Sequence, residues 1–139
     1  MSLTLAQARD DMLKMISDAW LPTGKPILYE DRGGTPPKEG TAWARVTIRH
    51  NRGDQETLSN PFGSRLFRRD GLVFVQIFTP VGNGLEQADA LAKIALDAYE
   101  GKSSQNGVWF RNVRYREVGP DGNWYQVNVI AEFEYSEAK

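Results

Sequence analysis

Residues with the potential for chemistry occur at three places in this 139-residue sequence, and the first surrounds the only histidine, His50. Asp54 and Glu56 follow it, and a histidine with neighbouring carboxylates is a set that can bind a metal ion. These residues lie in a polar stretch without periodicity, so we interpret His50 as a surface histidine and predict no metal site. The tripeptide Arg52-Gly53-Asp54 in the same stretch matches an adhesion motif, but three residues recur often by chance.

The second place is the glycine turn Val81-Gly82-Asn83-Gly84, which stands between a predicted strand and a predicted helix. A dinucleotide-binding fingerprint needs a third glycine where Gln87 stands. A tight turn with Asn83 as helix N-cap explains the same residues. A small-molecule- or nucleotide-binding α/β domain that uses Gly82 and Gly84 stays an alternative, as does a hydrolase whose groups converge only in space. We predict no cofactor and no catalytic residue.

The third place is a basic cluster of Arg65, Arg68 and Arg69 beside Phe62 and Phe67. Basic residues with aromatics can bind nucleic acid. The net charge of −1 argues against a general affinity for nucleic acid or for an anionic membrane. The cluster therefore indicates a subunit interface or a solvated sheet edge.

Composition is that of an ordinary globular domain, with 40% hydrophobic and 25% charged residues, and we expect one domain over residues 1–139. The sequence contains no cysteine, which excludes disulfides, thiol catalysis and thiolate metal ligands. The N-terminus is acidic and amphipathic, unlike a secretory signal. No apolar run approaches the roughly 20 residues of a membrane span.

The element that positions these groups is a strand predicted over residues 72–78. Val73, Val75 and Ile77 point to one face because side chains alternate along a strand, and the opposite face is apolar apart from Gln76. A strand that is apolar on both faces is central and covered on both sides. Helices of the chain can cover one face, and a neighbouring subunit can cover the other.

Two amphipathic helices are predicted, over residues 4–20 and 84–100. Thr4 with Gln7, and Asn83 with Glu86, have capping-box spacing. The apolar stripe of each helix is spaced at the helical period, with Leu5, Ala8, Met12, Met15, Ile16 and Ala19 in the first and Ala88, Leu91, Ala92, Ala95 and Tyr99 in the second. Because each helix has a single stripe, we expect both on the same face of one sheet.

The remaining strands are predicted over residues 25–30 (at an edge), 42–50, 65–69, 108–118 and 124–135. Arg69-Asp70-Gly71 is expected to turn the strand over residues 65–69 into the central strand. Residues 51–64 are expected to form a long polar loop, mobile in a monomer and ordered on assembly. If the last turn centres on Asp121, Tyr115 faces Val127 and Trp109 faces Phe133.

The order of these elements resembles a known family. An amphipathic helix ends in a proline turn, strands flank a polar loop, and LVFVQIFTPVGNG leads into the helix LEQADALAKIALDAYEG before a final hairpin. This arrangement is similar to the tail terminator and tail completion proteins of long-tailed bacteriophages and prophages, the group that includes minor tail protein U. The resemblance covers nearly the whole chain.

The resemblance implies an α+β fold with a single mixed, mostly antiparallel sheet and two helices packed on one face. It implies a virion structural protein at the head–tail junction, assembled in the host cytoplasm and not an enzyme. Such proteins form a homo-oligomeric ring, typically a hexamer, which caps the tail tube and contacts the tail-tube protein and a head–tail connector protein, without a membrane or sequence-specific nucleic acid. We expect the ring contact to pair a basic edge with an acidic helix face, through Arg65, Phe67, Arg68, Arg69, Glu86, Asp89 and Asp97.

Overall fold

The computed structural model describes residues 3–30, 34–37, 40–55, 65–82 and 84–139, which form a five-stranded sheet in the order β1-β2-β3-β5-β4. β1 pairs parallel with β2, and the other neighbours are antiparallel. The fold is therefore α+β with a mixed, mostly antiparallel sheet, as predicted. Its elements in chain order are α1 (Leu5–Trp20), a 3-10 turn η1 (Leu21–Thr23), β1 (Ile27–Tyr29), β2 (Trp43–Gln55), β3 (Leu66–Pro80), α2 (Glu86–Tyr99), β4 (Trp109–Asp121) and β5 (Trp124–Ala138).

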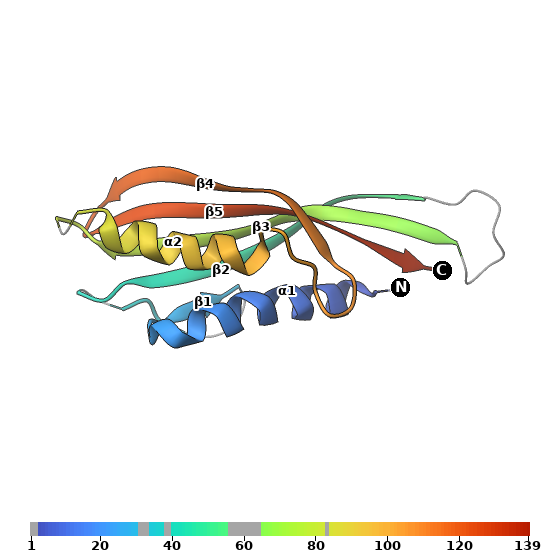
Figure 1. The fold of residues 1–139 in the computed structure, drawn as a ribbon, viewed down its shortest axis with the longest axis horizontal. Helices are drawn as coiled ribbons and strands as arrows, with labels where there is room; N and C mark the ends of the chain where they lie inside the picture. The colour runs from blue at the N-terminus through green and yellow to red at the C-terminus, as the bar shows by residue number, and fades with distance from the viewer. Residues whose placement is uncertain (1–2, 31–33, 38–39, 56–64, 83) are drawn as a thin grey trace.

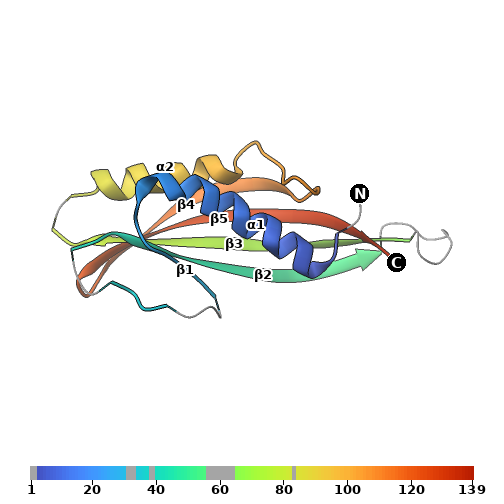
Figure 2. The same ribbon diagram turned by 90° about the horizontal axis from the view of Figure 1, so that it is seen from below.

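Both helices pack on the same face of the sheet, which we call the covered face, and the opposite face is called the bare face (Figures 1 and 2). The predicted stripe of α2 is buried throughout, and the buried residues of α1 are Ala8, Met12, Ile16 and Trp20. Of the other residues in the predicted stripe, Met15 and Ala19 are partly buried, and Leu5, at the first turn of α1, is 51% exposed. The buried Tyr99 hydroxyl donates to the Met12 carbonyl oxygen at 2.8 Å, which joins α2 to α1. In the described part of the chain, no helix is long and apolar enough to cross a membrane.

The centre of the sheet is β3, as predicted, with β2 on one side and β5 on the other. Val73, Val75 and Ile77 are fully buried on its covered face. The predicted turn at Arg69-Asp70-Gly71 is wrong, because β3 runs without a break through these residues. Gly71 allows this continuity, since a Cβ atom there would clash with the Arg49 carbonyl oxygen and would lie 2.7 Å from the Phe133 ring. The glycine thus marks a close approach of strands and not a turn.

The predicted loop over residues 51–64 is partly wrong, because β2 continues to Gln55 and pairs with β3 as far as Phe67. A bulge between His50 and Arg52 inserts one extra residue and keeps the alternation of faces on each side of it. Residues 56–64, which include Glu56 and Phe62, lie outside the described residues. β2, β3 and β5 extend together past the helices as a strand arm, comprising residues 51–55, 65–70 and 134–138 (Figure 1).

The termini of the helices only partly match the predictions. The Thr4–Gln7 capping box is present at α1. The predicted capping box at α2 is wrong, because that helix begins at Glu86 with Leu85 as N-cap and has no side-chain cap. Asn83 lies outside the described residues. Gly82 and Gly84 have φ values of 91° and 78°, which explains why glycines occupy this turn.

The register of the final hairpin also differs from the prediction. Tyr115 faces Val129, and Trp109 faces Glu134, while Phe110 faces Phe133. Bulges between Arg111 and Arg114 and between Glu117 and Gly119 shift the pairing. As a result Phe110 is buried, whereas Trp109 is 46% exposed.

Candidate assembly surface

The basic cluster lies at the start of β3, within the strand arm. Arg65 and Lys139 exchange two backbone hydrogen bonds of 3.1 and 2.8 Å, which close the end of the β3–β5 pair. The half-buried Phe67 ring lies 5.9 Å from the Arg69 guanidinium carbon and 5.9 Å from Lys139 Nζ. Cations at this distance from a ring are attracted by its quadrupole. Of the predicted arginines only Arg69 is shown against the Phe67 ring, and the second cation there is Lys139, which the sequence analysis did not include.

Arg68 and Arg69 point to opposite faces because they are neighbours in a strand. Arg68 Nε lies 3.1 Å from Glu134 Oε1 and its Nη2 lies 3.5 Å from Asp54 Oδ2, on the bare face. Arg69 Nη2 donates to Glu137 Oε1 at 3.2 Å on the covered face. Both arginines thus have partners inside the chain, which the sequence analysis did not foresee.

The bare face carries further ion pairs that the sequence analysis missed. Arg111 and Arg114 lie 3.6 and 3.1 Å from the Glu132 carboxylate. A hydrogen bond from Asn112, followed by the charges of these arginines, holds the pKa of Glu132 below its usual value. Asn112 reaches this carboxylate from the bulge, where its φ is 48°. Without that bulge the register would have placed other residues opposite Glu132. The alternation of side chains along the strand therefore could not predict that Arg111, Asn112 and Arg114 all contact this carboxylate.

The predicted acidic residues Glu86, Asp89 and Asp97 all lie on the exposed side of α2. Asp97 accepts from Lys93 Nζ at 2.6 Å, and Asp89 accepts from the Tyr115 hydroxyl at 2.9 Å. Burial, and then the hydrogen bond to Asp89, raise the pKa of Tyr115. α2 begins at the end of the sheet opposite the strand arm (Figure 1), so its first-turn residues Glu86 and Asp89 are separated from the basic cluster within one chain.

His50 is not the surface histidine that we predicted. It lies in β2, half-buried, and its Nε2 is 2.7 Å from the Tyr135 hydroxyl oxygen. Burial, with the positive charges of Arg9 and Arg69, lowers the pKa of His50. No three histidine, aspartate or glutamate side chains are grouped as metal ligands within the described ranges.

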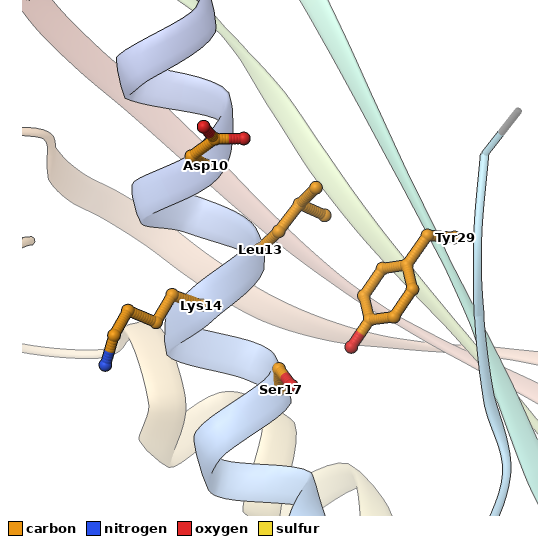
Figure 3. Close-up of a pocket in the computed structure, with 5 residues that line it drawn as sticks. All are labelled: Asp10, Leu13, Lys14, Ser17 and Tyr29. Atoms are coloured by element: carbon orange, nitrogen blue, oxygen red, sulfur yellow. The ribbon is translucent and has the colours of Figure 1, made fainter. Parts of the chain in front are cut away.

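A hollow of about 340 Å³ adjoins His50 on the covered face, where the strand arm passes the start of α1. It is lined by the exposed Leu5 together with His50, Asn51, Gly53 and Arg69. A second hollow of about 280 Å³ lies between α1 and β1 and is lined by Asp10, Leu13, Lys14, Ser17 and Tyr29 (Figure 3). Lys14, which lines this second hollow, pairs with Asp18 through Nζ and Oδ2 at 2.9 Å.

These features define a small α+β protein whose distinguishing residues lie on exposed surfaces and on a projecting strand arm. A protein-family model described as phage tail terminator protein matches residues 7–130, and the chain belongs to this family. It is therefore a structural component of a phage tail that interacts with other tail or head proteins.

Comparison with solved structures supports the fold. One solved chain superposes with a TM-score of 0.70 at 18% sequence identity, and the match covers 96% of each chain. At this identity the likeness concerns the fold alone. A search of curated proteins gave no match.

Proposed function

We propose that the protein forms a ring, a hexamer, that caps the tail tube at the head–tail junction, ends tube polymerisation and presents a surface to the head. In this role its partners are further copies of itself, the tail-tube protein and a head–tail connector protein, and it carries out no catalysis. The observation that carries the proposal is membership of the phage tail terminator family over residues 7–130.

The bare face supports a role in assembly. Leu72 and Phe74 of the central strand are only half-buried there, although both are large and apolar. A subunit or tube that covered them would remove apolar surface from water, which stabilises an interface by about 25 cal/mol for each Å². The same face carries the ion pairs of Glu132 and Glu134, which are suited to a contact that needs a defined orientation.

The charge distribution supports self-association. The basic groups of the strand arm and the first turn of α2, with Glu86 and Asp89, lie towards opposite ends of the sheet, so these groups can meet only between copies. A contact between two different surfaces is heterologous, and repetition of a heterologous contact closes a ring when the rotation per subunit permits. We therefore keep Arg65, Phe67 and Arg69 on one side of the proposed contact and Glu86, Asp89 and Asp97 on the other. Arg68 belongs with the bare face, where its intrachain partners lie.

The test combines mass in solution with a tail-length assay. Sedimentation of the pure protein over a wide range of concentrations, with and without tail tubes, should show a closed oligomer. A phage that lacks the protein should make tails of irregular length, and supplying the protein should restore uniform tails that join heads. A protein that stays monomeric under all these conditions, and whose loss leaves tails of normal length, would contradict the proposal.

A further inference from the structure

We propose that neighbouring subunits meet by inserting the start of α2 of one copy, with Val81, Leu85 and Glu86, into the hollow beside Leu5 and Arg69 of the next. This inference rests on the proposed ring and assigns its subunit contact. It commits to a second copy of this chain as the occupant of the hollow.

The receiving side is the hollow between α1 and the strand arm. Its volume of about 340 Å³ is at the lower end of the roughly 300–1,000 Å³ of small-molecule pockets, so it suits one or two side chains. Leu5 belongs to the helical stripe by spacing, yet it is 51% exposed at the rim. Gly53 leaves room for the Arg69 guanidinium beside the hollow, because a Cβ atom at position 53 would overlap it. The hollow thus combines an uncovered apolar side chain with space beside it.

The hollow is flanked by positive charge. Arg69 lines the hollow, and Arg9 reaches from α1 to β2, where its Nη1 donates to the Ile48 carbonyl oxygen at 3.4 Å. Arg69 and His50 both line the hollow, and the charges of Arg9 and Arg69 add to the effect of burial in lowering the pKa of His50. Glu137 pairs with Arg69 and offsets part of this charge. An occupant with an apolar tip and a carboxylate therefore complements the site.

The start of α2 has this composition. Val81 and Leu85 are 48% and 40% exposed, and they flank the glycine turn at the opposite end of the sheet from the hollow (Figure 1). Glu86 and Asp89 follow in the first turn of the helix. An apolar contact surrounded by opposite charges gives affinity through the apolar atoms and orientation through the charges. Because the two surfaces lie at opposite ends of one chain, the contact is head to tail.

The primary experiment uses disulfide trapping, for which the chain is suited because it contains no cysteine. Leu5→Cys and Leu85→Cys proteins are mixed and oxidised mildly, and we expect a covalent heterodimer. A protein with both substitutions should give a ladder of linked subunits. The matched control replaces Leu21, an apolar residue that is 77% exposed elsewhere on the surface, and Leu21→Cys mixed with Leu85→Cys should give no heterodimer above background. Equal trapping at position 21 would overturn the proposed contact.

A second measurement uses charge to disrupt the contact. Leu5→Asp and Leu85→Asp should each weaken self-association by roughly tenfold or more, since each removes the apolar anchor from one side of the contact. Leu21→Asp should associate as the wild type does, and all three proteins should have wild-type circular dichroism. A mixture of Leu5→Asp and Leu85→Asp should form dimers without rings, because one intact hollow can still receive one intact apolar tip.

The outcomes separate the two proposals. If the wild-type protein forms rings but both aspartate variants form them equally well, the contact assigned here is wrong and the ring rests on another surface. If the wild-type protein never self-associates, with or without tail tubes, the ring itself is wrong.

Discussion

On β3, Val73, Val75 and Ile77 are fully buried beneath the helices, whereas Leu72, Phe74 and Gln76 on the opposite side of the same strand are only half-buried. The covered face is closed by apolar packing within the chain. The bare face is closed at one end by an aromatic cluster, in which Trp43 stacks on Phe78 with ring centroids 4.3 Å apart. Towards the strand arm it carries ion pairs instead. The same strands therefore have a fully buried apolar core on one face and a partly exposed surface with apolar and charged side chains on the other. Such a surface is expected of a subunit that assembles with other proteins.

The largest expected effect tests this contrast directly. Ile77→Ala removes buried methyl groups beneath the helices and should lower the free energy of unfolding by about 2–5 kcal/mol, because it leaves a cavity. Leu72→Ala on the bare face should cost about 1 kcal/mol in the monomer, since water already reaches that site. Urea denaturation of both variants in dilute protein measures the difference. Equal losses would mean that the two faces are closed to the same extent.

The next effect concerns the close approach of strands at Gly71. Gly71→Ala should destabilise the fold by about 1–3 kcal/mol, because the added methyl group would meet backbone and a buried ring that cannot move freely. Gly53→Ala is the matched control in the neighbouring strand. Its methyl group would meet the far end of the flexible Arg69 side chain, which can move aside. Thermal unfolding of the pair tests this, and a larger loss at Gly53 would show that the Arg69 packing is the more rigid of the two.

A smaller effect is expected from the ion pairs of the bare face. The buried Glu134 carboxylate lies 3.1 Å from Arg68 and 4.0 Å from Arg111. Glu134→Gln keeps the shape and removes the charge, and it should cost about 1–2 kcal/mol in monomer stability, since both arginines are partly exposed to solvent. Asp18→Asn, in an exposed pair with Lys14 on α1, should have no measurable effect. Denaturant titration at low and high salt compares them, and no loss in Glu134→Gln would mark these pairs as dispensable for folding.

The smallest expected effect is a pH dependence of the folding stability, caused by His50 near the start of α1. The pKa of His50 is lowered in the folded chain, so the unfolded chain binds a proton more readily. Stability should therefore be complete above the ordinary histidine pKa of about 6.5 and should fall as the pH drops below it. Glu30 and Glu132 have lowered pKa values, so the stability that they contribute is lost only as the pH falls below their ordinary pKa of 4.5. The pH range of the histidine effect is therefore separate from that of the carboxylates.

Thermal unfolding of untagged protein between pH 7.5 and 5.5 measures the histidine contribution. His50→Gln keeps a group that can hydrogen-bond Tyr135, and it should flatten the decline over this range. An unchanged slope would assign the pH dependence to other groups.

Local sequence determined the elements of this protein. The apolar spacing of α2, the capping box at Thr4 and Gln7, and the two apolar sides of residues 72–78 are local patterns that each fix one element. Because each helix carries a single buried stripe, their placement on one face also followed from the sequence. The order of the elements was sufficient for the family resemblance, which the family model bears out.

The tertiary structure decided what depends on register and distance. Asp70 and Gly71 have the local signature of a turn, yet pairing on both sides holds them in a continuous strand. The hairpin bulge at Asn112 reverses which aromatic residue is buried, so Phe110 and not Trp109 joins the core. His50 meets Tyr135 across 85 positions of sequence. Arg68 and Arg69 pair with Glu134 and Glu137, which also lie on β5, far from them in the sequence. Sequence periodicity reports the face on which a side chain lies, but only the folded sheet fixes which side chain on another strand it meets.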